Sequence, residues 1–145
     1  MKRKIRYRSE KLLESTGMRR TKHRIAVLAV LLEKGKPLTQ EQIALALADN
    51  APNKVTIYRT LDTLCRAELV HRAFLHNRTW YFESAHHCDE RRCHPHFTCR
   101  SCGNTHCLTQ ISLPPLVSGL HKGFIIHRQQ VRLDGLCPDC SSLQI

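Results

Sequence analysis

Apolar side chains recur every three or four positions in three segments of the N-terminal half, a spacing typical of short amphipathic helices. The first segment follows an N-cap at Thr21 and ends at a C-cap, Gly35. The second opens on a capping box over residues 39–42. The third follows an N-cap at Asn53 and runs to Ala67. The pattern therefore predicts three helices joined by short loops.

The third of these helices has two distinct faces. Its inward face consists of Leu61 and Leu64 together with either Val55 or Ile57, because only one of the last two shares their side of the helix. The opposite face is polar and aromatic. We expect it to expose Lys54, Tyr58, Arg59 and Asp62.

Two short segments with strand character, residues 69–75 and 78–83, flank a turn expected at His76–Asn77. Three short helices followed by a hairpin is the element order of a winged helix-turn-helix, in which the third helix enters the major groove of DNA. The alternative is an ordinary amphipathic core helix. The Tyr58–Arg59 pair favours DNA, because arginine can bond guanine bidentately and an aromatic ring can contact thymine methyl groups.

The segment ahead of the first predicted helix is strongly basic. Residues 1–8 carry five Lys and Arg, and we expect a disordered arm or one that leads into a helix. A short helix from Ser9 to Ser15 would then end at Gly17.

The C-terminal 60 or so residues predict a much smaller core. A strand from Phe97 is followed by a turn and a second strand over residues 105–109. Pro114 would open a helix that ends near Gly123, and residues 124–133 would form a half-buried last strand. Because three short strands and one helix bury little apolar surface, we expect a metal ion and a dimer partner to stabilise this part of the chain.

Charge and cysteine are unevenly distributed along the chain. The 145 residues have a formal net charge of +11, and residues 1–83 hold 17 Lys and Arg against 8 Asp and Glu. Seven of the eight cysteines lie after residue 83. A basic half favours a polyanionic partner, namely DNA, RNA or an anionic membrane surface, although a merely solvated surface has the same composition.

Two Cys-x-x-Cys pairs, Cys99/Cys102 and Cys137/Cys140, are separated by 34 residues. Four thiolates in this arrangement are typical of a tetrahedral structural zinc site, and Gly103 suits the tight turn after the second thiolate. Unrelated buried thiols or disulfides are the alternative. We expect reduced cysteines and a soluble cytoplasmic protein, because no secretory signal and no apolar run long enough to span a bilayer is present.

Five motifs together resemble the ferric uptake regulator (Fur) superfamily, in the family's order and over nearly the whole chain. They are Gly17-x-Arg19-x-Thr21-x-x-Arg24, Val55-Thr56-Ile57-Tyr58-Arg59-x-Leu61, Tyr81-Phe82-Glu83, His94-x-His96-x-x-Cys99-x-x-Cys102-Gly103 and Gly135-x-Cys137-x-x-Cys140.

This resemblance implies a dimeric, metal-dependent repressor of the α+β class that binds a palindromic operator in double-stranded DNA. A winged helix-turn-helix domain with a basic arm (residues 1–83) would be joined by a metal-sensing linker (84–96) to a small α/β dimerisation domain (97–145) with the structural zinc. No membrane partner or small-molecule substrate is expected. The resemblance places DNA contacts at Arg19, Lys54, Thr56, Tyr58 and Arg59.

A second, regulatory metal site is expected near the two histidines. His94 and His96 are two positions apart, so in an extended segment both imidazoles point to one side. The resemblance implies Cys88 and Cys107 as the other two ligands. Two thiolates and two imidazoles favour Zn²⁺ over Fe²⁺ or Mn²⁺, which is typical of the zinc uptake regulator (Zur) branch.

Several alternatives stay open from the sequence. Glu83 and His71 also match ligand positions in parts of the family, so either one can replace or join Cys88. An iron- or peroxide-responsive regulator on the same scaffold is the first rival. A zinc-dependent hydrolase is a remote one, because the chain has neither a His-Glu-x-x-His nor a His-x-Glu pattern and few glutamates near the cluster.

Overall fold

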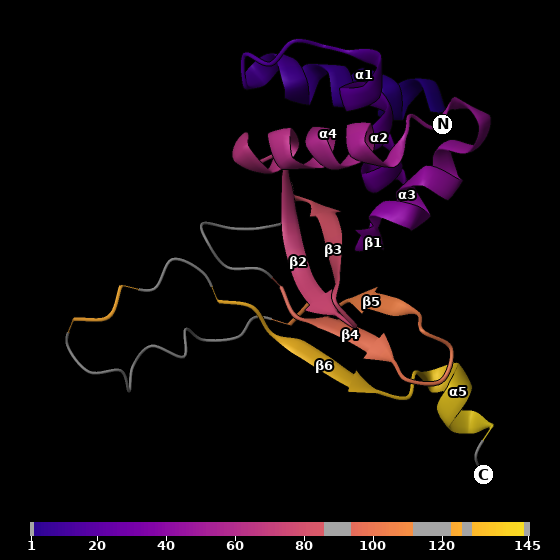
Figure 1. Ribbon diagram of the computed structural model, residues 1–145. Helices are drawn as coiled ribbons and strands as arrows, with labels where there is room; N and C mark the ends of the chain where they lie inside the picture. Colours follow the sequence, from indigo (N-terminus) through magenta and orange to yellow (C-terminus); the bar gives the residue numbers. More distant parts are fainter. Residues whose placement is uncertain (1, 86–93, 112–122, 126–128, 144–145) are drawn as a thin grey trace. The chain divides into compact units, whose positions relative to one another are not determined.

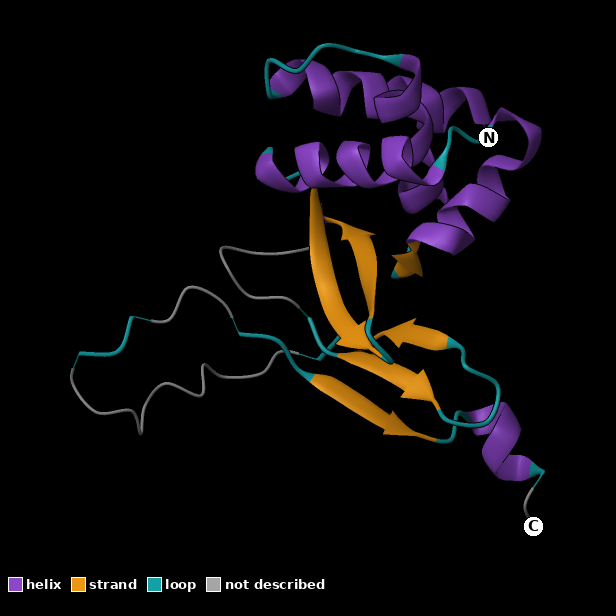
Figure 2. Ribbon diagram, in the orientation of Figure 1, coloured by secondary structure: helices purple, strands orange, loops and turns teal. Residues whose placement is uncertain are grey.

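The chain folds into two compact units, Met1–His86 and His87–Ile145, in the computed structural model shown in Figures 1 and 2. The structure describes residues 2–85, 94–111, 123–125 and 129–143. Most of the expected linker, residues 84–96, and the helix expected from Pro114 lie outside these ranges, so the three-part division of the chain stays a prediction. The described residues include no helix that is both long and apolar enough to cross a membrane.

Unit 1 begins with a helical layer, and its helix ends are set by local capping. The Thr21 hydroxyl accepts a hydrogen bond from the Arg24 N–H, and Gly35 adopts the left-handed conformation with φ of 58°. The Thr39 and Gln42 side chains form the expected capping box, and the Asn53 side chain caps the helix that follows it. The helices are α1 (Lys2–Ser15), α2 (Lys22–Lys34), α3 (Gln40–Leu47), the 3-10 helix η1 (Ala48–Asn50) and α4 (Lys54–Arg66).

The first helix is longer than expected. It begins at Lys2, so the basic arm is itself helical and the start expected at Ser9 is wrong. Ser9 and Leu13 are buried and Ile5 is half-buried, four positions apart on one face. Packing of this face against the rest of unit 1 extends the helix through residues that the charge pattern alone left ambiguous.

The core of unit 1 is apolar and lies between the helices and the sheet. Helix α4 contributes Ile57, Leu61 and Leu64, all fully buried, whereas Val55 is 58% exposed. Ile57 is therefore the inward residue of the two that the sequence left open. The remaining buried members of the core are Leu13, Ile25, Val27, Leu28, Val30, Leu31, Leu38, Ile43, Val70 and Phe82.

A three-stranded antiparallel sheet completes unit 1, in the order β1 (Leu38–Thr39), β3 (Thr79–Ser84), β2 (Val70–His76). The β2–β3 hairpin turns at Asn77 and Arg78, both with positive φ, which is one residue later than expected. A two-residue turn of this kind matches the twist of the flanking strands and needs positive φ at both positions. Helices α2 to α4 and this hairpin form a winged helix-turn-helix.

Unit 2 is built on a second three-stranded sheet with β4 (His96–Cys99) in the middle. β5 (Thr105–Cys107) runs antiparallel to it and β6 (Arg132–Gly135) runs parallel to it. The short helix α5 (Pro138–Ser142), which the sequence analysis did not identify, follows β6.

Three expectations about these strands are wrong. The last strand begins at Arg132, and Phe124 and Ile125 are exposed and lie in no strand. Leu133 is 46% exposed, so β6 is not the half-buried strand that its alternation indicated. β6 lies at the edge of the sheet and pairs with β4 alone among the described strands. The alternation of polar and apolar residues along β6 therefore does not lead to burial of its apolar side chain. β5 also ends at Cys107 rather than at residue 109.

Candidate metal centres and nucleic-acid interface

The four cysteines of the two Cys-x-x-Cys pairs lie together in unit 2. Cys99 ends β4 and Cys102 lies in the turn after it, where Gly103 has φ of 72°. Cys137 is the N-cap of α5, and Cys140 lies within that helix. Their four sulfur atoms are all within 4.8 Å of one another, and Cys99 and Cys137 are buried. All four are free thiols rather than disulfides.

The geometry of this four-cysteine cluster fits a tetrahedral ion. Four sulfurs held roughly 2.3 Å from one centre lie about 3.8 Å apart, and the Cys102 and Cys137 sulfurs are 3.8 Å apart. The Cys137 N–H also donates to the Cys99 sulfur over 3.4 Å. Backbone donors aimed at a sulfur favour its thiolate form, which is the form that binds metal.

The pKa values of two of these thiols are shifted in opposite directions. Backbone hydrogen bonds from Cys102 and Cys137 lower the pKa of the Cys99 thiol to about 6. A hydrogen bond with the Ser101 side chain lowers the pKa of Cys140, but hydrogen bonds with the neighbouring thiols and burial outweigh it and raise this pKa to about 12. The backbone donors thus favour the thiolate form of Cys99, whereas the neighbouring sulfur atoms favour the protonated form of Cys140.

A second group in unit 2 consists of His94, His96 and Cys107. Their candidate ligand atoms all lie within 4.8 Å of one another. β4 and β5 bring them together, since His96 is the register partner of Cys107. The His94 and His96 rings have centroids 4.6 Å apart, and His96 is only 1% exposed. Cys88, the fourth expected ligand, lies outside the described residues.

The two alternate ligands lie in unit 1 and contact each other. His71 and Glu83 are register partners in β2 and β3. The His71 Nε2 and Glu83 Oε2 atoms are 3.4 Å apart, and both side chains are buried. A buried histidine and carboxylate at this distance form an ion pair if the imidazole is protonated, and are also a pair of metal-ligand types.

The expected DNA-contact residues belong to unit 1, and most are accessible. Arg19, in the loop between α1 and α2, is exposed, and its carbonyl accepts a hydrogen bond from the Arg24 guanidinium over 2.9 Å. On α4, Lys54, Tyr58 and Arg59 are exposed and Thr56 is half-buried. These side chains of α4 are therefore accessible from solvent.

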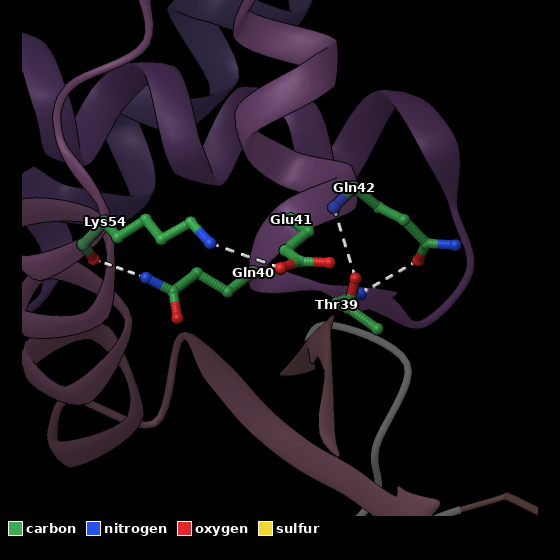
Figure 3. A network of polar contacts seen from close by, with 5 residues as sticks. All are labelled: Thr39, Gln40, Glu41, Gln42 and Lys54. Carbon is green, nitrogen blue, oxygen red and sulfur yellow. Dashed lines mark hydrogen bonds and ion pairs between the residues drawn. The ribbon is translucent and has the colours of Figure 1, made fainter. Parts of the chain in front are cut away.

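A polar network that no sequence motif predicts links the start of α4 to the start of α3 (Figure 3). The Gln40 side-chain amide donates to the Lys54 carbonyl, and the Lys54 ammonium lies 3.3 Å from the Glu41 carboxylate. Both Gln40 and Glu41 belong to the first turn of α3, next to its N-cap. The bond from Gln40 joins residues 14 positions apart, so only the tertiary structure reveals it.

Sequence comparisons match this chain to ferric uptake regulators. A sequence model of the ferric uptake regulator family matches residues 15–132. The transcriptional regulator FurA of Mycobacterium tuberculosis is 30% identical over 139 residues, which cover 89% of this chain and 87% of FurA. The ferric uptake regulation protein of Campylobacter jejuni is 26% identical over 145 residues, 93% of this chain and 87% of that protein.

Solved structures show the same fold. A zinc uptake regulator complexed with zinc and DNA has a TM-score of 0.71 at 19% identity, covering 99% of this chain and 97% of that one. The Helicobacter pylori ferric uptake regulator, described as having three functional metal-binding sites, has a TM-score of 0.64 at 20% identity, covering 97% and 94%.

A winged helix-turn-helix ahead of a small sheet unit with a four-cysteine cluster defines a DNA-binding protein with metal-binding capacity. The chain belongs to the ferric uptake regulator family. It is accordingly a transcriptional regulator and not an enzyme, which removes the hydrolase alternative.

Proposed function

We propose that this protein is a zinc-responsive, homodimeric repressor that controls metal-uptake genes from a palindromic operator. The observation that carries the choice of metal is the group His94, His96 and Cys107, in which two imidazoles and a thiol lie within ligand distance of one another. Soft sulfur together with nitrogen ligands favours Zn²⁺, whereas Fe²⁺ and Mn²⁺ prefer more oxygen. Such a regulator would act in the cytoplasm.

The two metal centres would have different roles. The four-cysteine cluster would hold a structural Zn²⁺, since tetrahedral thiolate sites of this kind stabilise small folds by about 10 to 16 kcal/mol of apparent binding free energy. The second group would hold the regulatory ion, with Cys88 as the fourth ligand and Glu83 or His71 as alternates. With fewer thiols and two histidines, this group makes a more exchangeable site than four thiolates do.

Regulation would follow from metal binding that ties the linker after Glu83 to the dimerisation domain. Ligation of His94 and His96, together with Cys88, would fix this segment and thereby hold the two winged helices of a dimer at the spacing of two half-sites. Metal can favour the DNA-competent form only to the extent that it binds this form more tightly. A shift from 1:99 to 99:1 takes a preference of about 10⁴-fold, or about 5.5 kcal/mol.

DNA recognition would use the exposed face of α4. Tyr58 and Arg59 would contact base edges, while Lys54 and Thr56 would contact the backbone, and Arg19 would reach the minor groove. The 58% exposure of Val55 adds an apolar side chain to this face, which suits a thymine methyl group. The family's DNA-bound zinc uptake regulator supports this arrangement as a fold-level analogy.

The first test is DNA binding by fluorescence anisotropy at fixed salt while buffered free Zn²⁺, Fe²⁺ and Mn²⁺ are titrated in parallel, because phosphate contacts make affinity salt-dependent. We expect Zn²⁺ alone to raise affinity for a palindromic operator, with one ion per subunit beyond the four-cysteine cluster. Cys107→Ala should abolish this response. His106→Ala is the matched control, since His106 neighbours Cys107 on β5 but is exposed. An unchanged response in Cys107→Ala would refute the assignment.

An iron- or peroxide-responsive regulator is the second candidate, and the buried Glu83 favours it. A carboxylate oxygen beside an imidazole is a better ligand set for Fe²⁺ than thiolates are. If Fe²⁺ rather than Zn²⁺ raises operator affinity, and if Glu83→Gln removes that effect, the regulatory role moves from the thiol-containing group to Glu83 and His71.

A further inference from the structure

Helix α1 has a charge pattern that its own folding does not explain. Its inner face is anchored by Ser9 and Leu13, while the basic residues of its first two turns are all exposed. Its first turn contains no acidic residue and its last turn no basic one, the reverse of what the helix dipole favours. Lys4 and Arg8 are also spaced i,i+4, so their like charges repel.

The helix separates its basic residues into two sets. Arg6 and Lys11 are neutralised within the helix by Glu10 at 3.2 Å and Glu14 at 2.8 Å. No described carboxylate forms an ion pair with the second set, which we call the α1 basic cluster because its members lie in the first two turns of the helix rather than on one face. It consists of Lys2, Arg3, Lys4 and Arg8, all exposed.

We propose that the α1 basic cluster binds DNA backbone phosphates outside the contacts made by α4, as a sequence-independent clamp. This inference rests on the proposed DNA-binding function and deepens it. From Lys2 to Ser15 the helix is about 20 Å long. The charge of duplex DNA, about one phosphate per 1.7 Å of its axis, therefore offers several partners along such a length.

The structure favours DNA over an anionic membrane as the partner. A helix that binds a membrane surface inserts an apolar face into the lipid. The apolar face of α1 is occupied, because Leu13 is fully buried in the core of unit 1 and Ile5 and Leu12 are half-buried. Apart from the Tyr7 ring, which is 61% exposed, what α1 leaves accessible is mainly charge, which fits phosphate groups that lie in water.

The test compares three proteins on an operator duplex and on a scrambled duplex of equal length, over a range of salt concentrations. The first is the wild type, and the second is R3Q/K4Q/R8Q. The third, R6Q/E10Q, is a matched control that removes an internal ion pair of the same helix without changing net charge. Circular dichroism reports whether α1 stays helical in each protein.

We expect R3Q/K4Q/R8Q to weaken binding to both duplexes by the same factor and to reduce the slope of log K against log salt by about 0.9 for each phosphate that is no longer neutralised. R6Q/E10Q should leave the slope unchanged. An unchanged slope in the helical triple variant would overturn the proposal. So would a loss of binding to phosphatidylserine vesicles with DNA binding intact.

Failure of the proposed function would give a different result. If the wild type shows no preference for the operator under any metal, the regulator assignment fails, whereas the salt slope on the scrambled duplex still tests the clamp. Because α1 acts on phosphates alone, the ratio of operator to scrambled affinity should stay constant in R3Q/K4Q/R8Q. A changed ratio would mean that α1 reads sequence, and would contradict a clamp.

Discussion

The two units of this chain are stabilised in different ways. Unit 1 buries thirteen apolar side chains in one cluster, several of them completely. Among residues 94–111, 123–125 and 129–143 of unit 2, no Leu, Ile, Val or Phe is buried, and the buried side chains include the thiols Cys99 and Cys137. Unit 1 can therefore fold by apolar burial, whereas the described part of unit 2 gathers candidate metal ligands in place of such a core.

The proposed functions of the two units differ in a corresponding way, since unit 1 would bind DNA and unit 2 would bind metal. The stability of an aliphatic core does not depend on the metal concentration. Such a core suits a domain in which α4 must keep the same position with or without metal. A unit whose stability comes from ligation responds to the concentration of an ion. With the proposed metal ions bound in unit 2, the chain would combine a DNA-binding unit that does not need metal for its fold with a second unit that does.

The largest expected effect comes from breaking the four-cysteine cluster. Cys99→Ser should release the structural ion and unfold unit 2, because a site worth about 10 to 16 kcal/mol exceeds the stability of a typical small domain. Unit 1 should keep its helices. Metal content by mass spectrometry and amide resonances of the two units would measure this. Cys65→Ser, in unit 1, is the control, and a folded unit 2 in Cys99→Ser would contradict the comparison.

A smaller effect is expected from a cavity in unit 1. Leu28→Ala should destabilise that unit by about 2 to 5 kcal/mol, since Leu28 is fully buried. Chemical denaturation followed by circular dichroism measures the loss, and the zinc content of unit 2 should not change. Leu45, 79% exposed, is the matched control, and Leu45→Ala should shift stability by about 0.5 kcal/mol or less. Equal losses in both variants would mean that the core does not stabilise unit 1.

The next prediction concerns recognition rather than stability. Arg59→Ala should weaken operator binding by about 1 to 3 kcal/mol and relax base preference, if its guanidinium bonds a base bidentately. Fluorescence anisotropy with operator and scrambled duplexes measures both the loss of affinity and the change in base preference. Arg66 lies at the other end of α4, 2.7 Å from Asp62, and Arg66→Ala should leave base preference unchanged. A footprint identical to the wild type would exclude Arg59 from base reading.

The smallest expected effect is local. Thr39→Ala removes the hydroxyl that caps α3 and should lower the stability of unit 1 by about 1 kcal/mol. Thr39→Ser keeps the hydroxyl and should lose much less. Thermal unfolding of the two variants distinguishes them. If Thr39→Ser is as unstable as Thr39→Ala, the methyl group matters and the cap does not.

Local signals in the sequence identified most of unit 1. The caps at Thr21, Gly35 and Asn53 act over three or four residues, so they can be read from the chain alone. The start of α1 was missed because it depends on burial of Ser9 and Leu13 against distant helices. The exposure of Leu133 was missed because alternation shows a strand's two faces but not what covers them.

The candidate sites were predictable to different degrees. Spacing identified the four-cysteine cluster, because paired Cys-x-x-Cys motifs have few other uses. The register that sets His96 opposite Cys107 had to come from the structure. The contact between His71 and Glu83, two residues considered separately, depends on the β2–β3 register and on the bulge between Arg72 and Phe74, which a pattern does not specify.

The bond between Gln40 and the Lys54 carbonyl has a consequence for how such a regulator can diverge. The acceptor belongs to the main chain, so it is present whatever side chain occupies position 54. The link between α3 and α4 through Gln40 is thus independent of the side chain at the first position of α4, whereas the Lys54–Glu41 ion pair is not. A lineage can therefore replace Lys54 and still keep the start of α4 joined to α3 through Gln40.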